Sequence, residues 1–265
     1  MSGTPIPDDN RRHRSRPAPV KPWWRRPWIV PLAIATIAFL IYALPPYVSL
    51  DPATSRIDVP AAPIYYPALV IHIFAGSVML CCAVLQLWPW LRRRHLPVHR
   101  WSGRLYMICA IPVFFGGLIV AQFPQGGPVQ QVANTMLGLL FGTTTALGYR
   151  AVRQRRIGDH REWMIRSFAL ASSIVANRVW TVICVAILSP NDEPDGLTAA
   201  IGIATWLSWV VNLIIAEAWL HRRNGRRQRP ARRDNAPRTS DSSSDSDQHS
   251  RPVAAAGPLA TEPQQ

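Results

Sequence analysis

Residues 65–104 read YYPALVIHIFAGSVMLCCAVLQLWPWLRRRHLPVHRWSGR, and this stretch decides the fold class. Its apolar part carries no charged residue before Arg92, and it exceeds the roughly 20 apolar residues that a helix needs to cross a bilayer. A cluster of arginines and histidines follows at once. An uncharged apolar run that ends in a basic cluster is typical of a transmembrane helix that leaves the membrane on the cytoplasmic side. The stretch therefore predicts a membrane protein.

The same pattern recurs along the chain and predicts six transmembrane helices. By residue number they cover 28–44, 65–90, 103–121, 132–149, 163–189 and 196–220. We therefore predict an all-α fold, a polytopic transmembrane helix bundle over residues 28–221 with a core over 65–189. The N-terminal tail (1–27) and the C-terminal tail (222–265) hold too few apolar residues to bury a core, and both are predicted to be disordered.

The basic residues fall on one side of the predicted membrane. The 265-residue chain has 29 Lys and Arg against 15 Asp and Glu, a formal net charge of +14. Of the 29, 27 lie in the two tails or in the connections around residues 91–104 and 150–166. This positive-inside pattern predicts cytoplasmic termini, and the expected partners are the bilayer and its anionic headgroups rather than nucleic acid. Arg56 and Arg178 are the two exceptions.

The first predicted span has a second interpretation, because a basic segment followed by an apolar run also begins a cleaved signal sequence. The run is long, however, and Leu44-Pro45-Pro46 follows it without a small-residue cleavage site. Its removal would also leave five spans with mismatched loop charges. We therefore predict that residues 28–44 form the first transmembrane helix.

His72 and Arg178 are ionisable residues inside predicted spans, where such groups are costly and usually face a partner or a cavity. Both fall in the outer half of the bilayer, His72 about 10 Å from the outer end of its helix and Arg178 about 22 Å from the cytoplasmic end of its own. A neutral imidazole accepts a hydrogen bond from a guanidinium, so we predict a direct His72–Arg178 bond. Two alternatives remain open: an outward-facing pocket in which Arg178 binds an anion or a quinone carbonyl, and snorkelling of Arg178 to the surface.

His72 and Gln86 share one face of the second predicted helix, fourteen residues apart. Two haem ligands on a cytochrome b helix have a similar spacing. Gln86 stands where the second histidine would be, and no other span holds a histidine at the depth of His72. His99 and His160 begin their helices at the opposite surface, so the pattern disfavours bis-histidine haem ligation across the membrane.

The third and fifth predicted spans begin alike, with His99-Arg100 followed by Arg104 and with His160-Arg161 followed by Arg166. Free N–H groups and the helix dipole favour anions at a helix start, and arginines strengthen that preference. One hypothesis is a single cytoplasmic site for a phosphate, a lipid headgroup or a metal, with Arg104 and Arg166 turned inward. The alternative is that these arginines only anchor the chain to lipid phosphates.

Small and polar residues within the spans predict helix contacts, because bilayer helices associate through them. Glu217 lies near the cytoplasmic end of the sixth span, within reach of Arg150 or Arg166. A stripe in the fourth span recurs every four residues, at Asn134, Gly138, Gly142 and Ala146. We interpret both features as packing.

At these residues the chain resembles a family of bacterial membrane proteins known as domain of unknown function 2306. The resemblance runs from about Tyr65 to Ser189. It rests on His72 with Gly76, on Gln86, on His99-Arg100-x-x-Gly103-Arg104-x-Tyr106, on His160-Arg161-x-Trp163-Met164-x-Arg166-Ser167 and on Arg178. It implies no activity, and it implies a site at His72, His99, Arg104, His160, Arg166 and Arg178.

The chain has no nucleophile–base–acid set, Gly-rich phosphate loop or metal-protease motif, so an enzyme is not indicated. We predict a protein of the bacterial plasma membrane that binds a quinone, haem or a small anionic ligand in a His- and Arg-lined bundle. The alternatives are a transporter or lipid-handling protein and a structural membrane subunit. The candidate ligand-binding residues are His72, Gln86, His99, Arg100, Arg104, His160, Arg161, Arg166 and Arg178.

Overall fold

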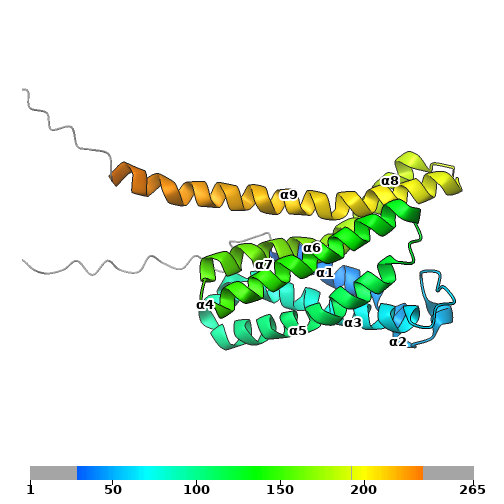
Figure 1. Ribbon diagram of the computed structural model, residues 1–265, viewed down its shortest axis with the longest axis horizontal. Helices are drawn as coiled ribbons and strands as arrows, with labels where there is room; N and C mark the ends of the chain where they lie inside the picture. Colours follow the sequence, from blue (N-terminus) through cyan, green and yellow to red (C-terminus); the bar gives the residue numbers. More distant parts are fainter. Residues whose placement is uncertain (1–28, 192, 235–265) are drawn as a thin grey trace, which may run out of the picture. The chain divides into compact units, whose positions relative to one another are not determined.

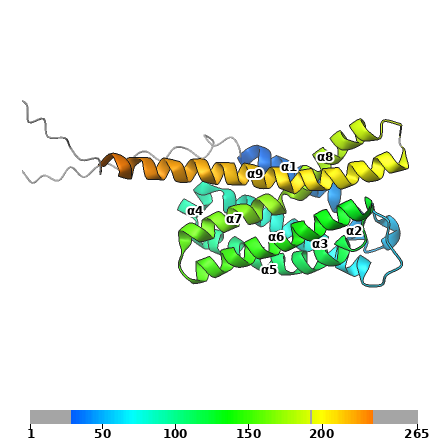
Figure 2. The ribbon, with the colours of Figure 1, turned by 45° about the horizontal axis from the view of Figure 1, so that its top comes forward.

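The computed structural model describes residues 29–191 and 193–234, and every regular element within them is helical, which confirms the all-α prediction (Figure 1, Figure 2). In chain order the elements are α1 (Ile29–Ala43), α2 (Pro45–Val48), the short 3-10 helix η2 (Pro52–Thr54), α3 (Tyr65–Leu87), α4 (Pro89–Arg94), α5 (Leu96–Ala121), α6 (Gly127–Arg153), α7 (Ile157–Ala171), α8 (Ser173–Leu188) and α9 (Pro194–Asp234).

Four of the helical segments in the described residues are long and apolar enough to cross a membrane: α3, α5, α7 with α8, and α9. The other two predicted spans also correspond to helices. α1 is apolar but has 15 residues, and α6 has 27 residues with several polar side chains among them. The chain therefore forms a helical membrane bundle of the predicted kind.

α5 begins earlier than the sequence predicted, at Leu96 rather than at Gly103. Pro97 lies in its first turn, where a proline costs no hydrogen bond and its fixed φ angle suits a helix start. The basic signature from His99 to Arg104 is consequently helical and has a defined face.

The fifth predicted span is broken at Ser172 into α7 and α8. The Ala169 carbonyl accepts hydrogen bonds from the Ser172 hydroxyl at 3.0 Å and from the Asn212 amide of α9 at 3.2 Å. Side chains thus supply donors to a carbonyl at the break, which is how a helix interruption is tolerated in a membrane.

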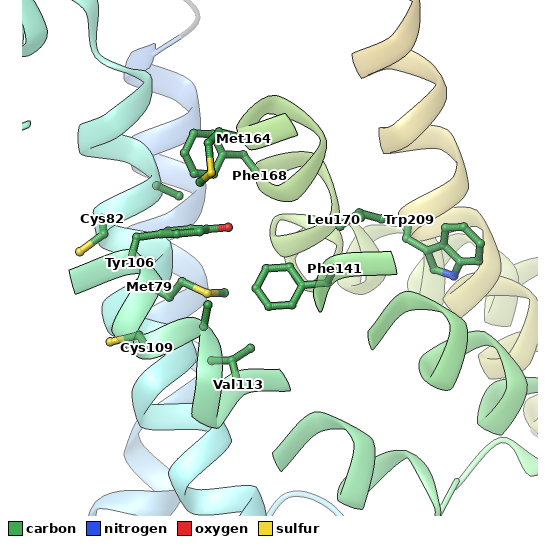
Figure 3. Packing of buried hydrophobic residues seen from close by; sticks show 12 residues of the cluster. Met79, Cys82, Tyr106, Cys109, Val113, Phe141, Met164, Phe168, Leu170 and Trp209 are labelled. Atoms are coloured by element: carbon green, nitrogen blue, oxygen red, sulfur yellow. The ribbon is translucent and has the colours of Figure 1, made fainter. Parts of the chain in front are cut away.

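Close contacts at glycines hold the central helices together. Gly116 of α5 lies against α3, where an added Cβ would be 3.0 Å from the Ala68 carbonyl oxygen. Gly138 and Gly142 of α6 face Leu118 and Phe114 of α5, so the predicted small-residue stripe is a packing surface. The main core forms between these helices and α7 (Figure 3).

The described part of the C-terminal tail differs from the prediction. α9 continues past residue 222 to Asp234, into the first residues of the predicted tail. By its contacts the chain divides into one unit up to Arg222 and a second from Arg223. The predictions for residues 1–27 and 235–265 lie outside the described residues.

Candidate functional site at the N-terminal ends of α5 and α7

A buried hydrogen-bond chain fixes the register between α5 and α7. The Tyr106 and Ser167 hydroxyls are 2.8 Å apart, and Ser167 also bonds to Thr145 of α6 at 2.7 Å. All three side chains are buried. Figure 3 shows the Tyr106 ring beside Phe168, at an edge-to-face centroid distance of 5.0 Å. Sequence reasoning did not identify this chain.

This register places His99 and His160, the histidines of the two predicted signatures, at the same height along the axes of α5 and α7. His99 precedes Tyr106 by seven residues, and His160 precedes Ser167 by the same number. Seven residues return a helix to nearly the same face, within about 20°, and shift it by about 10 Å along its axis. Since the two short connections around α6 reverse the chain twice, α5 and α7 run in the same direction. His99 and His160 therefore lie at a common depth, close enough to interact electrostatically.

The hydrogen bonds of His160 define which ring nitrogen is available. Its Nδ1 lies 2.8 Å from the Gly148 carbonyl oxygen of α6. Because a carbonyl only accepts, Nδ1 carries the hydrogen in the neutral ring and Nε2 keeps the lone pair. A histidine that binds a metal is commonly oriented by a carbonyl in this way.

His99 is half-buried and its Nδ1 atom has no hydrogen-bond partner within the described residues. Its backbone carbonyl, in contrast, accepts a bond from the Gln86 amide of α3, which also donates to the Ser102 hydroxyl at 2.7 Å. Gln86 therefore joins α3 to the first turns of α5. Gln86 thus has a structural role in joining two helices, and this role does not require a ligand.

The arginines of the two signatures do not form the single anion site that the sequence suggested. Arg104 is exposed and stacks on the exposed Trp101 ring at 5.4 Å. Arg166 forms a bidentate ion pair with Glu217 of α9, in which Nε lies 2.5 Å from Oε1 and Nη2 lies 3.0 Å from Oε2. This confirms the predicted contact with Glu217. The inward-facing hypothesis for Arg104 is wrong, and the charge of Arg166 is already compensated.

Three other arginines lie near the histidine pair or flank it. Arg100 is exposed, and Arg92 is close enough to His99 for electrostatic interaction. Arg161 is half-buried, and its guanidinium carbon lies 5.9 Å from the centroid of the Trp219 ring. Anionic groups are favoured beside them.

The predicted bond between His72 and Arg178 is wrong. The His72 Nδ1 atom lies 2.9 Å from the Val113 carbonyl oxygen, and the ring packs against Gly116 and Gly117 of α5. Arg178 is exposed on α8, and its guanidinium carbon is 6.0 Å from the Tyr42 ring. His72 pairs with a backbone carbonyl of the adjacent helix, and the position of that carbonyl depends on packing that the sequence pattern does not specify.

A comparison with models of protein families shows which family the chain belongs to. The family model described as a predicted membrane protein, DUF2306, matches residues 69–220, more than half of the chain. The chain belongs to the DUF2306 family. The match covers α9 up to Leu220 as well as the core from α3 to α8 that the sequence resemblance included. Neither the curated proteins nor the solved structures gave a match.

The candidate site consists of two imidazoles with arginines nearby. In the described part of the chain, no group of three or more His, Cys, Asp or Glu side chains could hold a metal ion. Toward the bundle interior the space is filled, since an added Cβ on Gly148 would lie 2.8 Å from the Met164 sulfur and one on Gly103 would lie 3.2 Å from the Gln86 amide nitrogen. The side chains of Met164 and Gln86 therefore leave the N-terminal ends of α5 and α7 as the side from which a ligand would reach the pair.

Proposed function

We propose that this DUF2306 protein is a bacterial plasma-membrane protein that binds haem at the cytoplasmic ends of α5 and α7, where His99 and His160 would hold the iron. The observation that carries the proposal is the pair of imidazoles at one depth, with the orientation of His160 fixed by the Gly148 carbonyl. The positive-inside distribution of arginines supports the cytoplasmic assignment.

The donor set favours haem over a bare metal ion. Zinc and copper sites in proteins usually take three or four protein ligands, whereas a haem iron needs at most two axial ones. Haem also carries carboxylates, and Arg92, whose charge acts on His99, lies near the pair and would favour them. A simple phosphate would use the arginines and leave the lone pair of the His160 Nε2 atom without a role.

The filled interior limits how haem can bind. Gln86 and Met164 occupy the positions next to Gly103 and Gly148, so haem held by both histidines would lie between the first turns of α5 and α7 and not deeper in the bundle. Bound there, haem supplies one-electron chemistry. The contribution of the chain is to orient the two imidazoles and to bind the carboxylates.

The test is the absorption spectrum and haem content of the detergent-purified full chain, as isolated and after titration with haemin. We expect a Soret band and one haem per chain. His99→Gln and His160→Gln should each weaken or abolish the band, because each removes one axial ligand, while thermal unfolding shows that the variants remain folded.

A matched control is His95→Gln. His95 lies in the same cytoplasmic segment, is exposed and packs its ring 5.1 Å from that of Trp90. This variant should keep the full band. If all of these proteins bind haem equally, or if none binds it, the proposed function is wrong and the structural-subunit alternative gains.

A further inference from the structure

The two basic residues outside the cytoplasmic clusters converge on one aromatic ring. Arg56 follows η2 in the connection between α1 and α3, and Arg178 lies on α8. Their guanidinium carbons lie 4.3 Å and 6.0 Å from the ring centroid of Tyr42, near the end of α1. Residues far apart in the sequence thus place two positive charges at one point on the outer side of the predicted topology.

These two charges are not compensated within the described residues. Neither arginine forms an ion pair there, and both are exposed. Asp51, an acidic residue of the same connection, instead accepts a hydrogen bond from the Ala53 backbone at 2.9 Å and caps η2. Asp58, the other acidic residue of this connection, forms no ion pair within the described residues either, so an anion from another molecule can bind the two arginines.

The surroundings of Arg178 indicate where that molecule comes from. Ile174 and Val182, one turn before and after it on α8, are 39% and 71% exposed. Ile41, beside Tyr42 on α1, is 71% exposed. Exposed aliphatic side chains on membrane helices face lipid, so Arg178 belongs to a lipid-facing surface. Charges on such a surface reach toward the headgroup region and pair with anions there.

We propose that Arg56 and Arg178, both in contact with Tyr42, bind the phosphate group of an anionic phospholipid of the outer leaflet. Guanidinium groups match phosphate oxygens with paired hydrogen bonds, and the face of an aromatic ring attracts and orients a guanidinium. The site is separate from the histidine pair and does not depend on the haem proposal.

The experiment measures binding of short-chain phosphatidylglycerol to the detergent-purified full chain by native mass spectrometry. Arg56→Gln and Arg178→Gln should each weaken binding about tenfold, the loss expected for one charge-assisted hydrogen bond. The double variant should lose less than the product of the two single losses, because both residues contact one phosphate. Arg104→Gln, which removes another exposed guanidinium that stacks on an aromatic ring, should act independently of Arg178→Gln.

Two further measurements test which ligand binds and whether the Tyr42 ring contributes to binding. Phosphatidylcholine, which has no net charge, should bind more weakly than phosphatidylglycerol, and inorganic phosphate should compete only weakly. Tyr42→Phe should keep the affinity and Tyr42→Leu should lower it, because the ring face and not the hydroxyl contacts the arginines. Independent losses for Arg56 and Arg178, equal binding of the two lipids, or free phosphate binding as tightly as the lipid would overturn the proposal.

Discussion

At the residue scale, the ion pair between Arg166 and Glu217 is one of the side-chain contacts that join α7 to α9. The Arg166 side chain is 21% exposed and Glu217 is 45% exposed, and the two groups are joined by two hydrogen bonds. A double-mutant cycle with Arg166→Gln and Glu217→Gln should give a coupling of about 1 kcal/mol, near the upper end for solvent-accessible pairs. The measurement is thermal or denaturant unfolding of the purified protein.

The exposed pair Arg156–Asp159 provides the control for this cycle. Its side chains are 56% and 52% exposed, and it joins neighbouring turns of one segment rather than two helices. Its coupling should stay below about 0.5 kcal/mol. Equal couplings for the two pairs would show that Arg166 does not hold α9 to α7.

At the element scale, close approach of α3 and α5 depends on the absence of a side chain at Gly116. An added Cβ there meets the backbone oxygen of Ala68, which cannot move as a side chain can. Gly116→Ala should therefore destabilise the protein by about 1–3 kcal/mol through overpacking.

Gly158→Ala in α7 is the opposite case, because nothing lies within 4 Å of its added Cβ. It should stabilise the helix by about 0.5–1 kcal/mol, and a shared sign for the two substitutions would contradict the packing described.

At the scale of the whole molecule, the positive-inside pattern predicts cytoplasmic termini. Reporter fusions placed after Pro63 should read as external, and fusions after Arg155, in the connection between α6 and α7, should read as cytoplasmic. The reverse result would place the histidine pair on the outer side and Arg56 on the inner side, and both proposed sites would need reassignment.

The helices and their packing could be predicted from the sequence because both depend on local patterns. Apolar runs located the helices. The small-residue stripe at Gly138 and Gly142 predicted the packing of α6 against α5, and the position of Glu217 predicted its ion pair with Arg166. The break at Ser172 was not predicted, because the sequence there stays apolar and the break depends on Asn212, forty residues further along the chain.

The candidate site was predicted only in part. The repeated His-Arg signatures identified His99 and His160, and the spacing of each to Tyr106 and Ser167 was a signal that could have shown they lie at one level. The direction of Arg104 and the partner of His72 could not be predicted. Both follow from which face of α5 packs against its neighbours, and α5 starts at Leu96 rather than where its apolar run begins.

The most direct test of the central claim is chemical cross-linking of residues 99 and 160. In a chain whose native cysteines Cys81, Cys82, Cys109 and Cys184 are replaced, His99→Cys and His160→Cys are introduced together with a protease site in the connection between α5 and α6. A short bismaleimide applied to membranes should hold the two fragments together after cleavage. The same treatment of Arg104→Cys with His160→Cys should leave them separate, because Arg104 points away from the bundle. Fragments that separate in the first case and stay joined in the second would contradict the paired-histidine site.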